Sequence, residues 1–108
     1  MPSNKRKRRP THPGEILREE FLLPIGLTPH ALAKALKVSP SRIRDIVHEK
    51  RGINVDTALR LARYFGGEAQ SWLNLQQAYD LKLATGSMQK IMDEVSPRGN
   101  TDGYAVAA

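Results

Sequence analysis

The 108-residue sequence contains no cysteine, which excludes disulfide bonds and thiolate metal sites and fits a reducing cytoplasm. It also lacks any apolar run near the roughly 18 residues that a membrane span requires. The basic N-terminus is not followed by the apolar stretch of a secretory signal. Alternating β-branched residues are missing as well. The sequence therefore predicts a cytoplasmic all-α protein without a membrane partner, long enough for one hydrophobic core.

Arrangements of side chains that could bind a metal or catalyse a reaction are also lacking in the sequence. The three histidines, His12, His30 and His48, fall on separate predicted elements, so we expect no metal site. No pairing of a nucleophile with a base and no glycine-rich phosphate loop is present. The single tryptophan, Trp72, lies at helical spacing among apolar residues and is expected in the core. We therefore predict no catalytic residues, no cofactor and no enzymatic activity.

Positive charge is in excess and unevenly distributed. The formal net charge is +6, and the Lys5–Arg9 run alone contributes +5. The segment 28–51 carries six basic and two acidic residues, or +4. A localised basic surface of this kind is what phosphate binding requires, although a solvated basic face has the same composition. We interpret residues 1–10 as a disordered basic arm that either follows the DNA minor groove or only adds non-specific affinity.

Helix start and stop signals divide the rest of the chain. Five helices are expected to begin near Pro13, Pro29, Pro40, Val55 and Glu68, with Thr11 or His12, Thr28, Ser39 and Asn54 as caps for the first four. The first of these helices is expected to end at Pro24 and Gly26, the fourth at Gly66 and the fifth at Gly86. We assign residues 11–84 to one helical domain. Residues 85–108 form a C-terminal extension with a short helix over 88–95 and a frayed tail.

The segment Pro29–His48 has the features of a helix-turn-helix. Two proline-marked helix starts stand eleven residues apart and leave only the turn Lys37-Val38-Ser39 between the helices. Small Ala33 permits a steep crossing of the two helices. Apolar residues that lock the pair are Leu32, Leu36, Val38, Ile43 and Ile46. Lys37 departs from the pattern, because the first turn residue needs a left-handed conformation that costs a non-glycine residue about 1 kcal/mol.

The second of these helices has the faces of a recognition helix. At about 100° per residue, its apolar residues cluster on one side, and Ser41, Asp45 and His48 point away, flanked by Arg42 and Arg44. Arginine pairs bidentately with guanine, and Asp45 either accepts from cytosine or orients an arginine. Hydroxyls, helix N-termini and charge suit phosphate contacts, although Thr28 and Ser39 also serve as caps. The predicted DNA-binding residues are Thr28, Ser39, Ser41, Arg42, Arg44, Asp45, His48, Lys50 and Arg51.

Five motifs flank or follow the helix-turn-helix in a distinctive order. They are His12–Leu17 (HPGEIL), Arg51–Ile53 (RGI), Thr57–Ala62 (TALRLA), Trp72–Gln76 (WLNLQ) and Tyr79–Leu81 (YDL). In this order, over about residues 11–84, the chain resembles the HigA-type antitoxins of type II toxin–antitoxin systems. These belong to the lambda-repressor-like (Xre) class. The Lys5–Arg9 run and the residues after Ala84 depart from the family pattern.

The resemblance implies a lambda-repressor-like five-helix domain and a bacterial, nucleoid-associated homodimer. Such a protein represses its own operon at a palindromic operator and neutralises a RelE-like (HigB-type) toxin that cleaves messenger RNA. One alternative is a stand-alone Xre-type regulator without a toxin partner, and another is a protein-interaction module that no longer reads DNA. Two roles are open for the apolar residues near the C-terminus: they either form the subunit contact of the dimer or cover the core of their own chain. These residues are Leu81, Leu83, Met88, Ile91 and Met92.

Overall fold

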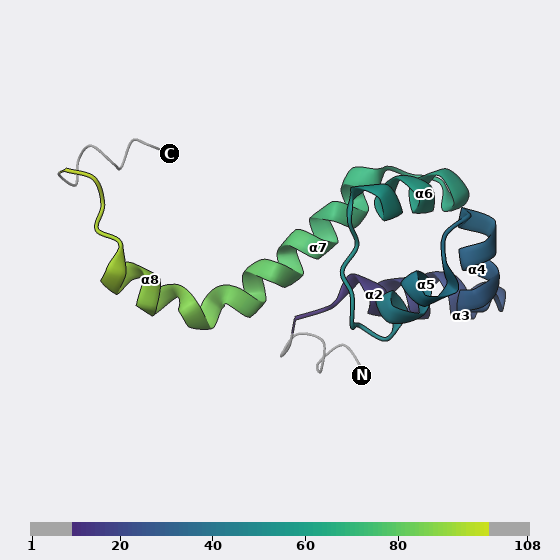
Figure 1. The fold of residues 1–108 in the computed structure, drawn as a ribbon, viewed down its shortest axis with the longest axis horizontal. Helices are drawn as coiled ribbons and strands as arrows, with labels where there is room; N and C mark the ends of the chain where they lie inside the picture. The colour runs from purple at the N-terminus through teal and green to yellow at the C-terminus, as the bar shows by residue number, and fades with distance from the viewer. Residues whose placement is uncertain (1–9, 100–108) are drawn as a thin grey trace.

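The computed structural model describes residues 10–99, and all regular structure within them is helical (Figure 1). The first helix is continuous through α2 (Pro13–Ile16), a π-helical segment (Leu17–Leu22) and α3 (Leu23–Ile25). Four helices follow it: α4 (Pro29–Leu36), α5 (Pro40–Val47), α6 (Val55–Phe65) and α7 (Ala69–Leu83). A 3₁₀ turn (Ala84–Ser87) then leads into α8 (Met88–Glu94). The predicted all-α, five-helix lambda-repressor-like fold is confirmed. Residues 1–9 of the basic arm predicted for residues 1–10, together with residues 100–108, lie outside the described part.

The helix starts are capped as their sequences predict. Thr28 Oγ1 accepts a hydrogen bond from the Ala31 amide at 3.1 Å, and Asn54 Oδ1 accepts from the Thr57 amide at 2.8 Å. Ser39 Oγ accepts from the amide three residues later at 3.3 Å. Of the two cap candidates for the first helix, Thr11 and His12, it is His12 that forms the cap: its Nδ1 accepts a hydrogen bond from the Gly14 amide at 2.8 Å. Each cap satisfies an amide that has no partner within its own helix.

Of the two residues expected to end the first helix, Gly26 does so and Pro24 does not. Pro24 lies inside α3, and the helix continues to Gly26, which takes a left-handed conformation with φ 66° and ψ 28°. A proline has no N–H, and its ring crowds the carbonyl four residues earlier. The preceding π-helical turn, in which the Leu23 amide donates to the Arg18 carbonyl, widens the backbone before the proline. This widening lets the helix pass through Pro24.

The core lies where the first helix, α4, α5, α6 and the start of α7 meet. Among its fully buried large side chains are Leu17, Leu32, Ile43, Ile46 and Leu61. Trp72 is 5% exposed and packs its ring against Phe21, with centroids 5.0 Å apart. The prediction that the tryptophan is a core residue is therefore confirmed.

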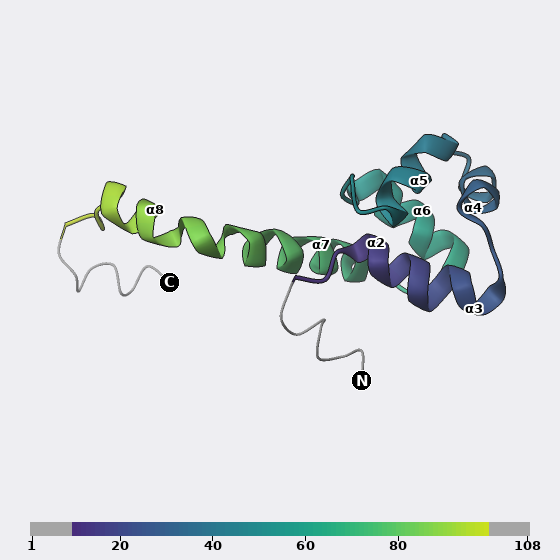
Figure 2. The same cartoon turned by 90° about the horizontal axis from the view of Figure 1, so that it is seen from below.

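The C-terminal helices leave this core. Figures 1 and 2 show α7 running out of the helical cluster and α8 standing far from α4, α5 and α6. Gly86 was expected to break the helix, but it lies in the 3₁₀ turn that joins α7 to α8. A substituent on Gly86 would meet nothing within 4 Å, and its φ is not in the left-handed region, so its backbone continues the helical path. The division of the chain at residue 84 stays a prediction. Within residues 10–99 no helix has the length and apolar character to cross a bilayer.

Candidate nucleic-acid interface

Helices α4 and α5 form a helix-turn-helix with the predicted internal contacts. Ala33 is fully buried where the helices cross, and Leu32 and Ile43 are buried beside it. Lys37 has the left-handed conformation predicted for the first turn residue, with φ 62° and ψ 42°. The Val38 amide then donates to the Ala33 carbonyl at 3.0 Å, which satisfies a carbonyl at the end of α4.

Two arginines outside the motif hold the carbonyl ends of its helices. Arg18 donates from Nη1 to the Val47 carbonyl at the end of α5, and its Nη2 lies 3.4 Å from Glu49 Oε2. Arg60 donates from Nη1 to the Leu36 carbonyl at the end of α4, at 2.9 Å. A cation at a helix C-terminus is favourable for the helix dipole as well as for the free carbonyls. The sequence analysis missed both roles, because the bonded groups are 24 and 29 residues apart in the chain.

Gly14 lets the first helix approach the recognition helix closely. A Cβ atom built on Gly14 would lie 1.8 Å from the Ile46 carbonyl oxygen in α5 and 3.0 Å from His12 Nδ1. Only a residue without a side chain allows this contact. The HPGE motif therefore supplies two features: His12 caps the first helix, and Gly14 forms the close contact with α5.

Three of the nine predicted DNA-binding residues, Thr28, Arg44 and His48, line a groove beside the start of α4. The volume of the groove is about 310 Å³. It is lined by Thr28, Pro29, His30, Pro40, Arg44 and His48. The groove thus brings Thr28 together with the exposed outer side chains of α5, Arg44 and His48. Pro29, His30 and Pro40 were not among the predicted site residues, because the helix starts were assigned only as caps and phosphate contacts.

The other predicted site residues do not line this groove. Ser41 Oγ is 3.4 Å from Ser39 Oγ at the start of α5. Asp45 Oδ2 lies 3.7 Å from Arg51 Nη2, so the aspartate pairs with an arginine. Lys50 is exposed in the turn after α5, which is stabilised by the Lys50 amide donating to the Asp45 carbonyl at 2.8 Å.

Arg42 points toward α6. Its Nη1 donates to Asp56 Oδ2 at 2.7 Å and lies 3.4 Å from Thr57 Oγ1. Hydrogen bonds from Arg42, and then from Arg60, lower the pKa of the Asp56 carboxyl below its usual 3.8. Arg42 therefore links the recognition helix to the start of α6, whereas the neighbouring Arg44 remains in the groove.

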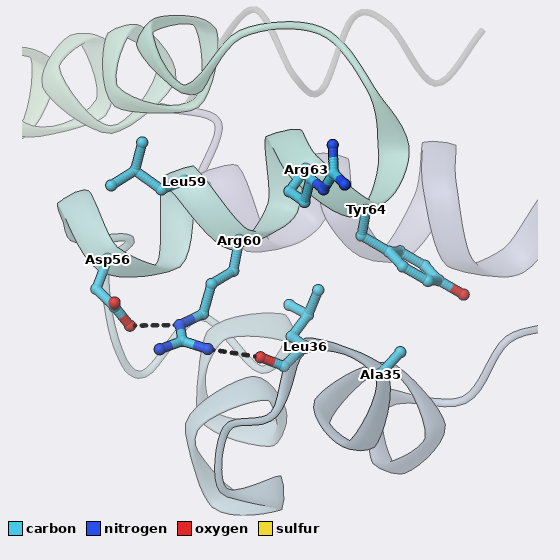
Figure 3. Close-up of a pocket in the computed structure, with 7 residues that line it drawn as sticks. All are labelled: Ala35, Leu36, Asp56, Leu59, Arg60, Arg63 and Tyr64. Atoms are coloured by element: carbon cyan, nitrogen blue, oxygen red, sulfur yellow. Dashed lines mark hydrogen bonds and ion pairs between the residues drawn. The ribbon is translucent and has the colours of Figure 1, made fainter.

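A larger hollow of about 590 Å³ lies between α4 and α6 (Figure 3). In Figure 3 the Arg60 guanidinium lies between Asp56 and the Leu36 carbonyl, with Arg63 and Tyr64 farther along α6. Arg60 Nε is 2.9 Å from Asp56 Oδ2. Arg60 therefore joins α6 to the end of α4 and helps to hold the motif in place.

The last two motifs attach α7 to the rest of the domain. Gln76 Oε1 accepts from the Ile53 amide at 2.7 Å, and its Nε2 donates to Asp80 Oδ1 at 3.0 Å. The Tyr79 ring packs edge-on against the His12 ring, with centroids 4.7 Å apart. Burial is the main cause that lowers the pKa of His12 below 6.5. These contacts explain why the HPGE, RGI and WLNLQ–YDL motifs occur together in one sequence.

Comparison with known proteins agrees with this geometry. The helix-turn-helix family matches residues 17–72, slightly more than half of the chain. Antitoxin HigA of Pseudomonas aeruginosa, solved with the higBA promoter, superposes with a TM-score of 0.78 at 50% identity, covering 83% of this chain and 99% of that one. The chain belongs to the HigA-type helix-turn-helix proteins.

Relatives in the family share most of their length with the chain. Virulence-associated protein I of Dichelobacter nodosus is 66% identical over 91 residues, which is 84% of each protein. Antitoxin HigA-1 of Vibrio cholerae is 39% identical over 77 residues, covering 71% of this chain and 72% of the relative. The family assignment made from the five motifs is confirmed.

Proposed function

We propose that the chain is an antitoxin that represses its own operon by sequence-specific operator binding and neutralises a cognate RelE-like (HigB-type) toxin, acting at the nucleoid in the bacterial cytoplasm. The observation that carries the DNA-binding half is the groove in which the start of α4 meets Arg44 and His48 of α5. The promoter complex of the Pseudomonas aeruginosa relative supports it. The toxin half is supported by the antitoxin relatives.

In this proposal the two helix starts and the basic turn bind the backbone, and the outer face of α5 reads bases. Thr28 and Ser39 present hydroxyls and helix N-terminal amides to phosphates, together with Lys50 and Arg51. Ser41, Arg44 and His48 reach base edges in the major groove. Arg42 and Asp45 remain proposed site residues. Because each is already in an ion pair, a base contact by either one requires that pair to rearrange or to be shared.

The base-reading role is tested on the operon's own upstream DNA. Arg44→Ala is expected to weaken operator binding by about 1–3 kcal/mol, or roughly 5- to 150-fold, and to reduce selectivity over random DNA. Arg63→Ala removes an exposed arginine from α6, outside the groove, and is the matched control. Fluorescence anisotropy at fixed salt measures both. Unchanged selectivity in Arg44→Ala would place base reading elsewhere.

The toxin role needs a separate experiment. The product of the adjacent gene is expressed alone and together with this protein, and cell growth and messenger RNA cleavage are followed. We expect toxicity alone and rescue on co-expression, with rescue retained by Arg44→Ala because that substitution affects DNA binding only. If the adjacent product is not toxic, or is not rescued, the protein is a stand-alone regulator.

A further inference from the structure

Asp56 holds the Arg42 side chain at the edge of α5 that faces α6. Arg42 Nη1 donates to Asp56 Oδ2 at 2.7 Å and lies 3.4 Å from Thr57 Oγ1. A hydrogen bond between two charged groups at this distance is of the strong, charge-assisted kind. Thr57 is 1% exposed, so packing fixes its hydroxyl. The guanidinium of Arg42 therefore rests between a carboxylate and a fixed hydroxyl, outside the groove that Arg44 lines.

Asp56 has a second partner that keeps it in place without Arg42. Arg60 Nε donates to the same Asp56 Oδ2 atom at 2.9 Å, and Arg60 Nη1 donates to the Leu36 carbonyl at 2.9 Å (Figure 3). The carboxylate is thus tied through Arg60 to the end of α4. The side chain of Asp56 is 50% exposed and that of Arg42 is 27% exposed, so another anion can approach the Arg42 guanidinium from solvent. When such an anion takes the arginine, Arg60 still holds the carboxylate.

The pair stands at the helix start that the proposed function places against a DNA phosphate. Arg42 lies in the first turn of α5, where its amide donates to Ser39 Oγ at 3.3 Å, and Asp56 lies in the first turn of α6. A phosphate at the start of α5 and the Asp56 carboxylate are both anions that one guanidinium can bind. While Arg42 is paired with Asp56, the pair brings no net charge to the interface, and the carboxylate repels the phosphate.

The other cations of residues 42–51 are not restrained in this way. Arg44 and Lys50 are exposed. Arg51 is also exposed, and its Nη2 is 3.7 Å from Asp45 Oδ2, which is beyond hydrogen-bond distance. Within this segment, which the structure describes in full, Arg42 is therefore the cation whose charge a carboxylate holds by a short hydrogen bond.

We propose that Asp56 limits the affinity of the protein for DNA by competing with a phosphate for Arg42. Phosphate contacts carry no sequence information, so a cation that binds a phosphate strengthens operator and random complexes alike. Asp56 therefore affects how tightly the domain binds any DNA and how steeply that binding depends on salt, and it leaves base reading unchanged. The inference rests on the proposed function, because it takes the start of α5 to meet the DNA backbone.

Removal of the carboxylate separates competition from a merely structural role, because the two predict opposite changes. Asp56→Asn keeps an acceptor oxygen for Arg60 and releases the charge of Arg42. If the pair only held α5 in place, this variant would bind DNA more weakly. Under competition, we expect operator and random DNA to be bound about three- to eightfold more tightly per bound chain at about 0.1 M salt. The upper value follows from one phosphate contact with a salt slope of about 0.9, which contributes a factor of about 8 between 1 M and 0.1 M salt.

Fluorescence anisotropy over a series of salt concentrations is the measurement. The plot of log affinity against log salt should steepen by about 0.9 per bound chain in Asp56→Asn and keep the wild-type slope in Asp56→Glu, which retains the charge. Glu94→Gln is the matched control, because it removes a carboxylate from an ion pair with Lys90 on α8, far from α4 and α5 (Figures 1 and 2). It should bind as the wild type does, and urea melts check that each variant is folded.

The double variant Arg42→Ala/Asp56→Asn tests whether Arg42 is the cation that is released. In the Arg42→Ala background, Asp56→Asn should leave the salt slope as it is, because no cation is set free. Weaker DNA binding by Asp56→Asn, an unchanged slope, or a steepening that persists without Arg42 overturns the inference. A gain confined to the operator also overturns it, because the released arginine would then read bases. A wild-type chain that does not select the operator refutes the proposed function instead, so the two proposals fail separately.

Discussion

The substitution Gly14→Ala tests the contact that seats the recognition helix. The added methyl group would lie 1.8 Å from the Ile46 carbonyl oxygen and 2.8 Å from its carbon. Both atoms are backbone, so no side chain can rotate away, and the helices must separate by more than about 1 Å to restore van der Waals distance. Overpacking of a core costs about 1–3 kcal/mol. Because both atoms are backbone, we take the upper end of this cost. Alanine recovers up to about 1 kcal/mol of helix propensity, so we expect a net loss of about 2 kcal/mol.

Such a loss is a large part of the 5–15 kcal/mol that stabilises an ordinary domain. For a chain of this size it lowers Tm by roughly 8–16 °C. Urea denaturation followed by circular dichroism measures the free energy of unfolding, and anisotropy measures operator binding, which should also weaken because α5 is displaced. Gly86→Ala is the control: a methyl group there meets nothing within 4 Å, so we expect no loss of stability and a gain of up to about 1 kcal/mol from helix propensity. A loss below about 1 kcal/mol for Gly14→Ala would refute the close approach.

Two further predictions concern the cap and the turn. His12 accepts a hydrogen bond through Nδ1, and its pKa in the folded chain is lowered. As the pH drops below 6.5, His12 therefore binds a proton in the unfolded chain before it does so in the folded chain, and the free energy of unfolding should fall. At higher pH this loss is absent. His12→Asn keeps a capping oxygen and should flatten the dependence in pH-resolved urea melts; a slope equal to that of the wild type would assign the effect to another group. Lys37→Gly should raise the free energy of unfolding by up to about 1 kcal/mol, because glycine adopts φ 62° without strain. Lower stability in the same urea assay would contradict this.

Local signals sufficed for the helix starts and for the helix-turn-helix itself. Thr28, Ser39 and Asn54 cap the helices that follow them, because a cap acts on an amide only three residues away. The turn conformation of Lys37 was predictable for the same reason. Pro24 was misread, because a proline usually ends a helix and nothing in the local sequence announces a π-helical turn.

The contacts that position the site were beyond local reasoning. Arg18 and Arg60 bond carbonyls on helices distant in the sequence, and any exposed arginine would have the same pattern. Arg42 was assigned to the outer face from the helical wheel, but its length lets it reach Asp56 at the start of α6. A wheel gives the direction of a Cβ atom and not the end of a long side chain.

The division between Arg42 and Arg44 has a consequence for how binding specificity changes in this family. Within residues 10–99 the side chains of Arg44 and His48 make no hydrogen bond or ion pair, whereas Arg42 is tied to Asp56. Exchanging the residue at position 44 or 48 therefore breaks no hydrogen bond or ion pair, whereas exchanging Arg42 breaks its pair with Asp56. Under the proposed base-reading role of Arg44 and His48, we therefore expect a new operator sequence to be accessible by single substitutions on one edge of α5, with the opposite edge held constant. Grafting the outer residues of one member onto another should succeed when the Arg42–Asp56 pair is kept.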